Sequence, residues 1–352
     1  MPGAPADERP PNLTMNTTTP PTSASTSIPT ALSHGASAAP GSAGPGGVAA
    51  SGSRGRAGAQ PAPTGPVLFA RYAFGPNRLG LCGPEDWRSL LEMGTAASAT
   101  AAQALEIDHG LRDLAAGFEG AYPYLELIAS AHGIADPMDA RVVDAYWIGN
   151  SLSDGVDPVL LTRSMDTRFR PQLLPEAWKW LEGKAAAGAR PTHAFHVFDI
   201  FPRVGLMRGG AVTDAVGLMD SCRLRWGRVV EISGGSLVVN AVPLGLAEGK
   251  LALGEPKVQT VRRWLDGTGF VSDVQVGDVV SLHWDWACEV LDAPRLDALQ
   301  RRTLHQLELA NQPLEGPRLL ACARGLGLAA GAPRSGAGCW GAEVWGWLLG
   351  RR

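Results

Sequence analysis

The sequence predicts an α+β protein in which an all-α domain precedes a small five-stranded β-barrel of the OB type and a C-terminal helix. Between about 84 and 181, apolar residues recur at three- and four-residue spacing, which is typical of helices with one buried face. After Cys222 the pattern changes to short β-rich runs separated by turn residues. Both ends of the chain are expected to be disordered tails.

These changes in composition divide the chain into five segments. Residues 1–66 contain no aromatic side chain and are dominated by Pro, Gly, Ala, Ser and Thr, so they cannot bury enough apolar surface to fold. We expect a helical domain over 67–205, a connector over 206–221, and the barrel with its helix over 222–311. The Gly-, Ala- and Arg-rich end, 312–352, is expected to be a low-complexity tail.

Two parts of the helical domain need separate interpretation. Its opening, 69–84, is so rich in Gly and Pro that we expect an ordered loop there, followed by a helix capped by Asp86. Residues 193–205 fit either a buried helix or an extended segment, and Pro202 prevents either from continuing far.

The barrel is predicted from five short β-rich runs within about 70 residues. These runs are 228–232, 236–241, 258–264, 279–283 and 286–291. Gly234-Gly235 joins the first two as a hairpin turn. Asp292 is expected to cap the final helix, with Pro294 in its first turn.

Composition also restricts the class of function. The formal net charge of −3 provides no basic field to attract nucleic acid or an anionic membrane, and no apolar run approaches the roughly 18 residues of a membrane span. Five cysteines, an odd and sparse set, disfavour a disulfide framework and fit a reducing cytoplasm. They are Cys82, Cys222, Cys288, Cys322 and Cys339.

Cys222 and His283 are the main candidates for a metal or cofactor site. Arg223 and Arg225 would favour the Cys222 thiolate, which is the form that binds metals, although a free Cys is often a small core residue. Asp285 could orient an imidazole nitrogen of His283, although a lone His is more often structural.

His193 and His196 are weaker metal-ligand candidates. Their i, i+3 spacing would place both on one face of a helix. Neighbouring phenylalanines indicate an apolar setting, which favours structural roles. Cys82 and Cys288 are weaker candidates still.

The 222–300 module resembles the HypC/HupF family of [NiFe]-hydrogenase maturation chaperones. Members of that family open with a Cys and a strand of the type Pro-Gly-x-Val-Val-Glu-Ile. Here Cys222 precedes Trp-Gly-Arg-Val-Val-Glu-Ile (226–232). The closing segment, Gly-Asp-Val-Val-Ser-Leu-His-Trp-Asp-Trp-Ala-Cys-Glu-Val-Leu (277–291), matches without a gap and places His283 on the family's characteristic His.

The chain departs from that family in three ways. Its Cys is internal, Trp226 replaces the family's Pro, and the middle of the module, 242–270, is longer. The resemblance covers under a quarter of the chain.

The resemblance implies an accessory protein rather than an enzyme. The Cys222 thiolate would transiently carry an iron with cyanide and carbonyl ligands, and His283 would lie nearby. The implied partners are a hydrogenase large subunit or a maturation scaffold protein, with no nucleic acid and no membrane.

Two alternatives stay open at this point. One is a nucleic-acid-binding OB module, although residues 222–291 carry seven Lys/Arg against eight Asp/Glu. The other is an enzyme acting between the two domains, with Cys222 as nucleophile and His283 or His196 as base.

Overall fold

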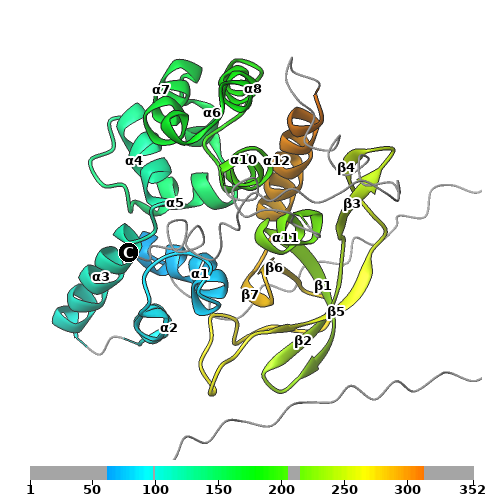
Figure 1. The fold of residues 1–352 in the computed structure, drawn as a ribbon. Coiled ribbons are helices and arrows are strands. Elements are labelled where there is room, and N and C mark those ends of the chain that lie inside the picture. Colours follow the sequence, from blue (N-terminus) through cyan, green and yellow to red (C-terminus); the bar gives the residue numbers. More distant parts are fainter. Residues whose placement is uncertain (1–61, 98–99, 205–214, 313–352) are drawn as a thin grey trace, which may run out of the picture. The chain divides into compact units, whose positions relative to one another are not determined.

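The computed structural model describes residues 62–97, 100–204 and 215–312, all within one compact unit, Gln60–Arg352. Helices come first, then two sheets, then a long helix (Figure 1), so the predicted mixed α+β class is confirmed. The two tails expected from composition lie almost wholly outside the described residues, as does most of the predicted connector.

The helical part is built from short elements whose apolar faces share one core. They are α1 (Gly65–Arg78), α2 (Trp87–Thr95), α3 (Ala101–Ala116), α4 (Tyr122–Ala131), α5 (Ala140–Trp147), α6 (Ser151–Asp154), α7 (Pro158–Phe169), η1 (Arg170–Gln172), α8 (Pro175–Ala186), α9 (His193–Phe195), η2 (His196–Ile200) and α10 (Phe201–Val204). Asp86 caps α2 as expected, because its Oδ1 accepts from the amide of Ser89 at 3.1 Å.

The prediction of an ordered loop over 69–84 is wrong for most of that segment, because α1 is helical as far as Arg78. Pro66 lies in the first turn, where the missing N–H would have had no helical partner. Pro76 lies in the last turn, so it interrupts little of the helix. Burial of side chains such as Phe69 and Tyr72 in the core outweighs the poor helix propensity of this segment.

The ambiguous stretch that begins at His193 is helical, with a change of pitch in its middle. The turn η2 is a π-helix in which the amide of Phe201 bonds to the carbonyl of His196. Pro202 has no N–H to donate and so cannot continue a regular α pattern back to Phe198. Single π turns of this kind occur frequently at functional sites.

The larger sheet has five strands in the order β1-β2-β5-β7-β6, and β6 also pairs back with β1. Its strands are β1 (Arg225–Ser233), β2 (Ser236–Ala241), β5 (Lys257–Arg262), β6 (Val279–His283) and β7 (Trp286–Val290). The contact between β5 and β7 is a single parallel pair, Arg262 with Trp286. A separate hairpin of β3 (Leu244–Ala247) and β4 (Lys250–Leu253), which the sequence did not predict, occupies part of the long middle segment.

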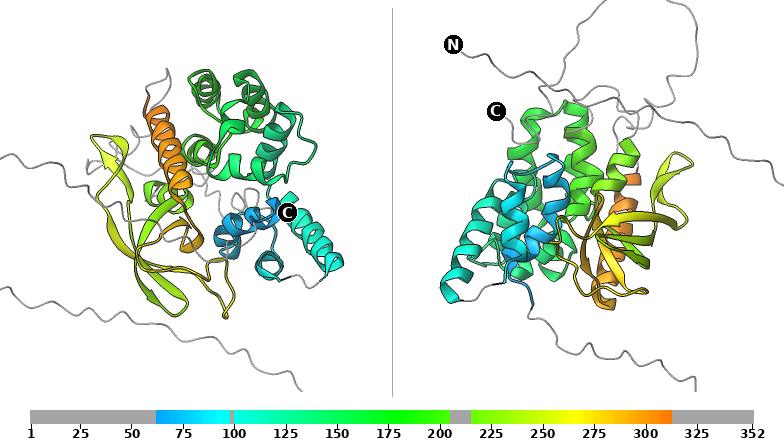
Figure 2. Two further views of the ribbon diagram at one scale, coloured as in Figure 1. Left: turned by 180° about the vertical axis from the view of Figure 1, so that it is seen from behind. Right: turned by 90° about the horizontal axis from the view of Figure 1, so that it is seen from below.

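Two helices connect the sheet to the helical part. Helix α11 (Ala215–Cys222) leads directly into β1, and α12 (Ala293–Asn311) follows β7 with its first turn capped by Asp292, as expected. Figures 1 and 2 show α12 beside the β3–β4 hairpin, and hydrogen bonds between Asn311 and Leu251 join the two.

Helix α1 packs directly on the hairpin formed by β6 and β7. A Cβ atom added at Gly75 would lie 2.6 Å from the carbonyl oxygen of His283 and 3.1 Å from Cβ of Trp286. Only glycine permits so close an approach. Within the described ranges, no helix is long and apolar enough to cross a membrane.

Candidate metal centre

The ends of three elements meet at one cluster of potential metal ligands: His193 in α9, Cys222 at the end of α11, and His283 at the end of β6. The candidate ligand atoms all lie within 4.8 Å of one another, and the two imidazole centroids are 4.9 Å apart. Both histidines are buried, whereas Cys222 is partly exposed. The structure therefore joins the two main candidates from the sequence and adds one of the weaker pair.

A backbone carbonyl orients His283. Its Nδ1 lies 2.6 Å from the carbonyl oxygen of Tyr72. A carbonyl can only accept, so Nδ1 carries the proton and Nε2 keeps its lone pair. That Nε2 is buried and makes no hydrogen bond of normal geometry among the described residues, while burial lowers the His283 pKa and the nearby backbone of Cys222 partly opposes that lowering. An unprotonated, unpartnered imidazole nitrogen is in the form that a metal ion requires.

His193 is held at both nitrogens. Its Nε2 lies 2.8 Å from the carbonyl oxygen of Cys222, and its Nδ1 lies 3.3 Å from the Tyr146 hydroxyl. In this arrangement Nε2–H donates and Nδ1 accepts from the hydroxyl. Because a tyrosine hydroxyl can also accept, the opposite tautomer is compatible with Tyr146. In that tautomer Nε2 would offer a lone pair to a metal only once the Cys222 carbonyl had turned away from it.

The C-terminus of α11 positions Cys222. The last carbonyls of a helix lack hydrogen-bond donors within the helix. At the end of α11, neighbouring segments supply these donors. The amide of Trp284 donates to Ser221 O at 2.8 Å, and His193 donates to the carbonyl of Cys222 itself. Trp284 has a φ of 57°, an uncommon conformation for a bulky residue, which is a form of strain that occurs frequently at functional sites.

Burial keeps all three groups uncharged in the absence of a metal. It raises the pKa of the Cys222 thiol to about 12, opposed by an interaction with the Trp284 side chain. It lowers the pKa of His193 to about 4 and that of His283 well below its usual range, and the neighbouring His193 adds to the latter shift. At neutral pH the site thus holds two neutral imidazoles and one thiol. A metal ion would have to displace a single proton, from sulfur.

Two charged side chains that were expected to act on Cys222 and His283 form ion pairs with other residues instead, which corrects both expectations. Arg223 pairs with Asp220 at 2.9 Å rather than activating the thiol, and it does not contribute to the pKa of Cys222. Asp285 binds Arg78 at 2.7 Å instead of orienting His283, whose orientation comes from the Tyr72 carbonyl.

An indole ring forms one wall of the cluster. The Trp147 ring lies 4.8 Å from that of His193 and 5.7 Å from that of His283, and it stacks on Tyr72 at 5.5 Å. Sequence patterns indicated Trp147 only as part of a helix face and gave Tyr72 no role. Their function as walls and supports depends on contacts between distant segments, which no local pattern reveals.

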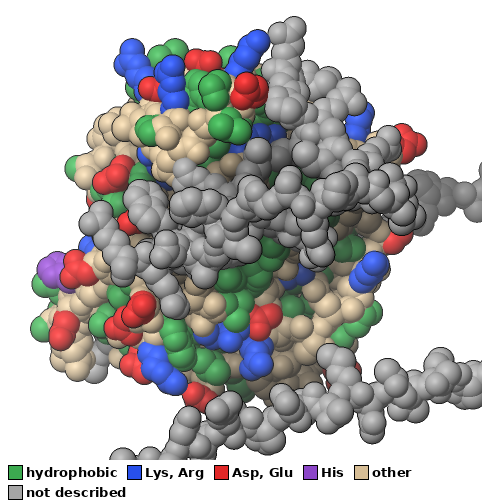
Figure 3. Space-filling view, viewed as in Figure 1, with side chains coloured by type: hydrophobic (Ala, Val, Ile, Leu, Met, Phe, Trp, Pro, Cys, Tyr) green, Lys and Arg blue, Asp and Glu red, His purple; other side chains and the backbone are tan. Residues whose placement is uncertain are grey.

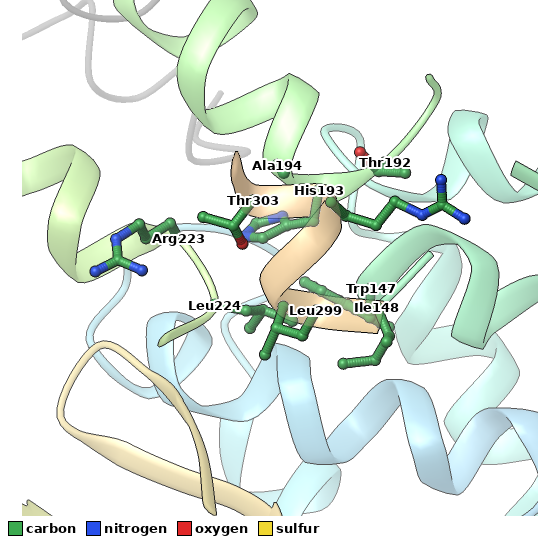
Figure 4. A pocket seen from close by; sticks show the side chains of 10 residues that line it. Trp147, Ile148, Thr192, His193, Ala194, Arg223, Leu224, Leu299 and Thr303 are labelled. Atoms are coloured by element: carbon green, nitrogen blue, oxygen red, sulfur yellow. The ribbon is translucent and has the colours of Figure 1, made fainter. Parts of the chain in front are cut away.

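A small cavity adjoins His193. Its volume of about 10 Å³ is room for one water molecule. Figure 4 shows the His193 imidazole beside the Thr303 side chain at this cavity, while the guanidinium of Arg223 points away from it. Arg223 and Arg302 also line the cavity, and their guanidinium groups pair with Asp220 and Asp154.

The remaining sequence candidates lie outside the cluster. His196 packs edge-on against Tyr124, with ring centroids 5.8 Å apart, and burial lowers its pKa to about 3. Cys288 is fully buried in β7, and Cys82 is partly buried. Cys322 and Cys339 lie outside the described residues.

Comparison with known proteins identifies a family and no close relative. A model for DUF6390, described as a family of unknown function, matches residues 61–316. No curated protein matches the chain, and no solved structure does.

Proposed function

We propose that this chain, which belongs to the DUF6390 family, is an accessory protein that binds a transition-metal group through His193, Cys222 and His283. The observation that carries the proposal is the meeting of three donor atoms within 4.8 Å, supplied by segments far apart in the sequence. The unpartnered lone pair on His283 Nε2 is the second support, because a buried polar atom is rarely left unsatisfied without a reason.

The donor set fits a borderline or soft transition metal. Two imidazoles and a thiolate suit Zn²⁺, Co²⁺, Cu or iron, whereas Mg²⁺ and Ca²⁺ prefer oxygen ligands. Structural zinc sites normally close with four protein ligands, while three leave one position for an exogenous group. A site of this kind is suited to a cargo that arrives with ligands of its own and must leave again.

The resemblance of the 222–300 module to hydrogenase maturation chaperones supports a more specific version of the proposal. In that version the cargo is an iron with cyanide and carbonyl ligands, and the partners are a hydrogenase large subunit or a maturation scaffold protein. Low-spin iron suits a soft thiolate. The same proposal includes an OB-like barrel. Its support is the five-stranded sheet, whose strands pair in a closed order.

The test is metal content and ligand identity in protein purified without air. Elemental analysis is expected to give one transition metal per chain, and infrared spectroscopy to give cyanide and carbonyl stretches for the specific version. Cys222→Ser is expected to abolish metal retention. Cys82→Ser, which removes the other partly exposed cysteine among the described residues, serves as the matched control. Equal metal content in all three proteins would reject the proposal.

The two alternatives are less well supported. A nucleophilic Cys222 would need a lowered pKa, but burial raises it. Burial also lowers the pKa of both candidate bases, that of His196 to about 3 and that of His283 well below its usual range, so each would accept a proton only weakly. On the face seen in Figure 3, Lys and Arg side chains are interspersed with Asp and Glu, without the single-sign field that nucleic-acid binding requires.

A further inference from the structure

Helix α1 contains Pro76, and the N–H that this proline lacks affects the candidate metal centre. In a regular α-helix the amide of residue 76 would donate to the carbonyl of Tyr72, four residues earlier. Pro76 has no N–H to donate, and its ring crowds that carbonyl away from the helix axis. The oxygen of Tyr72 is therefore left to find a partner outside the helix.

That partner is His283. The carbonyl oxygen of Tyr72 accepts from Nδ1 of His283 at 2.6 Å, in a buried setting. The interaction keeps the proton on Nδ1 and the lone pair on Nε2, which makes no hydrogen bond of normal geometry with any residue that the structure describes. Pro76, more than 200 positions before His283, thus lacks the amide that would otherwise occupy the carbonyl to which this imidazole is bound.

The surrounding contacts hold the carbonyl in place. Gly75 lets α1 approach the backbone of His283 so closely that a Cβ would stand 2.6 Å from its carbonyl oxygen. The hydroxyl of Tyr72 donates to Glu289, whose carboxylate also binds Arg295 at 2.6 Å. Tyr72 is therefore anchored at its side chain while its backbone oxygen faces the imidazole.

We infer that Pro76 is a positioning residue of the metal centre, which acts by releasing the Tyr72 carbonyl to orient His283. The inference rests on the proposed metal-binding function, and it adds a role for a residue outside the ligand set. It also accounts for a proline inside a helix that burial of side chains such as Phe69 and Tyr72 stabilises. Local rules are broken most often where a functional site requires it.

The test compares two proline variants of the same helix. Pro76→Ala restores the amide and returns the Tyr72 carbonyl to the helix, whereas Pro66→Ala changes the first turn, where no carbonyl is released. Nitrogen NMR of isotope-labelled histidine reports the tautomer of His283 in the metal-free protein. Titration with Co²⁺, followed by its absorption bands, reports affinity and geometry.

We expect the wild type and Pro66→Ala to show His283 protonated at Nδ1, and Pro76→Ala to show a mixture of tautomers. Loss of an orienting partner typically weakens metal binding about 10- to 100-fold, and that is the expected loss for Pro76→Ala. Unchanged tautomer and affinity in Pro76→Ala would overturn the inference, as would a wild-type His283 protonated at Nε2, a result that needs no variant to fold. A wild type that has the expected tautomer but binds no Co²⁺ would reject the metal-binding proposal and leave the orienting role standing.

Discussion

The Nδ1 atom of His283 lies 2.6 Å from the backbone oxygen of Tyr72, a residue 211 positions earlier in the chain. This hydrogen bond joins the helical part to the end of β6, and in the part of the chain that the structure describes Nε2 of the same ring makes no hydrogen bond of normal geometry. Together with His193 and Cys222 it creates a site that exists only when α1, α9, α11 and β6 are all in place.

Metal binding is therefore expected to stabilise the folded protein strongly. A ligand present at 100 times its Kd, bound only by the folded state, adds about 2.7 kcal/mol to the free energy of unfolding. We expect Zn²⁺ to raise the melting temperature of the wild type and to leave that of His193→Ala and Cys222→Ser almost unchanged. Thermal unfolding followed by circular dichroism measures both. An equal rise in every protein would indicate binding elsewhere.

The pH dependence of metal affinity follows from which group must lose a proton. Both ligand histidines have lowered pKa values, about 4 for His193, so they are already neutral near pH 7. The Cys222 thiol, with its pKa raised to about 12, is still protonated. One proton is released per metal, and affinity should rise about tenfold per pH unit between about pH 6 and 8. Calorimetry in buffers of different ionisation enthalpy counts the protons. A count of two would mean that a histidine is charged in the metal-free site.

The lowered pKa of His196, a partly buried residue, also predicts that the folded protein is sensitive to acid. Burial lowers the pKa of His196 from 6.5 to about 3, so between these values the unfolded chain binds a proton that the folded protein does not. Stability therefore falls as the pH is lowered through this window, by up to about 1.4 kcal/mol per pH unit for each such histidine. Urea unfolding between pH 7 and about pH 4 should show a smaller slope for His196→Gln. The exposed His109→Gln is the control, and it should behave as the wild type does.

Gly75 should tolerate no side chain. A Cβ there would stand 2.6 Å from the carbonyl oxygen of His283, a backbone atom that cannot move aside cheaply. We expect Gly75→Ala to lower the free energy of unfolding by about 1–3 kcal/mol, the usual cost of overpacking. Gly245→Ala, where nothing lies within 4 Å of the added Cβ, should change it little. Similar denaturant midpoints for the two variants would show that α1 does not pack on the hairpin as described.

Local sequence was sufficient to predict much of this protein. Periodicity and composition predicted the helical part, the five strands of the larger sheet and the cap at Asp292, because hydrophobic spacing and capping depend on neighbours a few residues away. The proximity of Cys222 and His283 was also predicted, from their positions at the two ends of the β-rich module and from the resemblance of that module to a known family.

Tertiary structure alone decided the remainder. The helix at 65–78 forms against its own propensity because burial and the contact at Gly75 outweigh local cost, and no local rule reports such contacts. That His193 rather than His196 joins the cluster of candidate ligands depends on which of the two rings faces α11 and β6. The pKa values of the ligands follow in turn from burial, which exists only once distant segments have packed together.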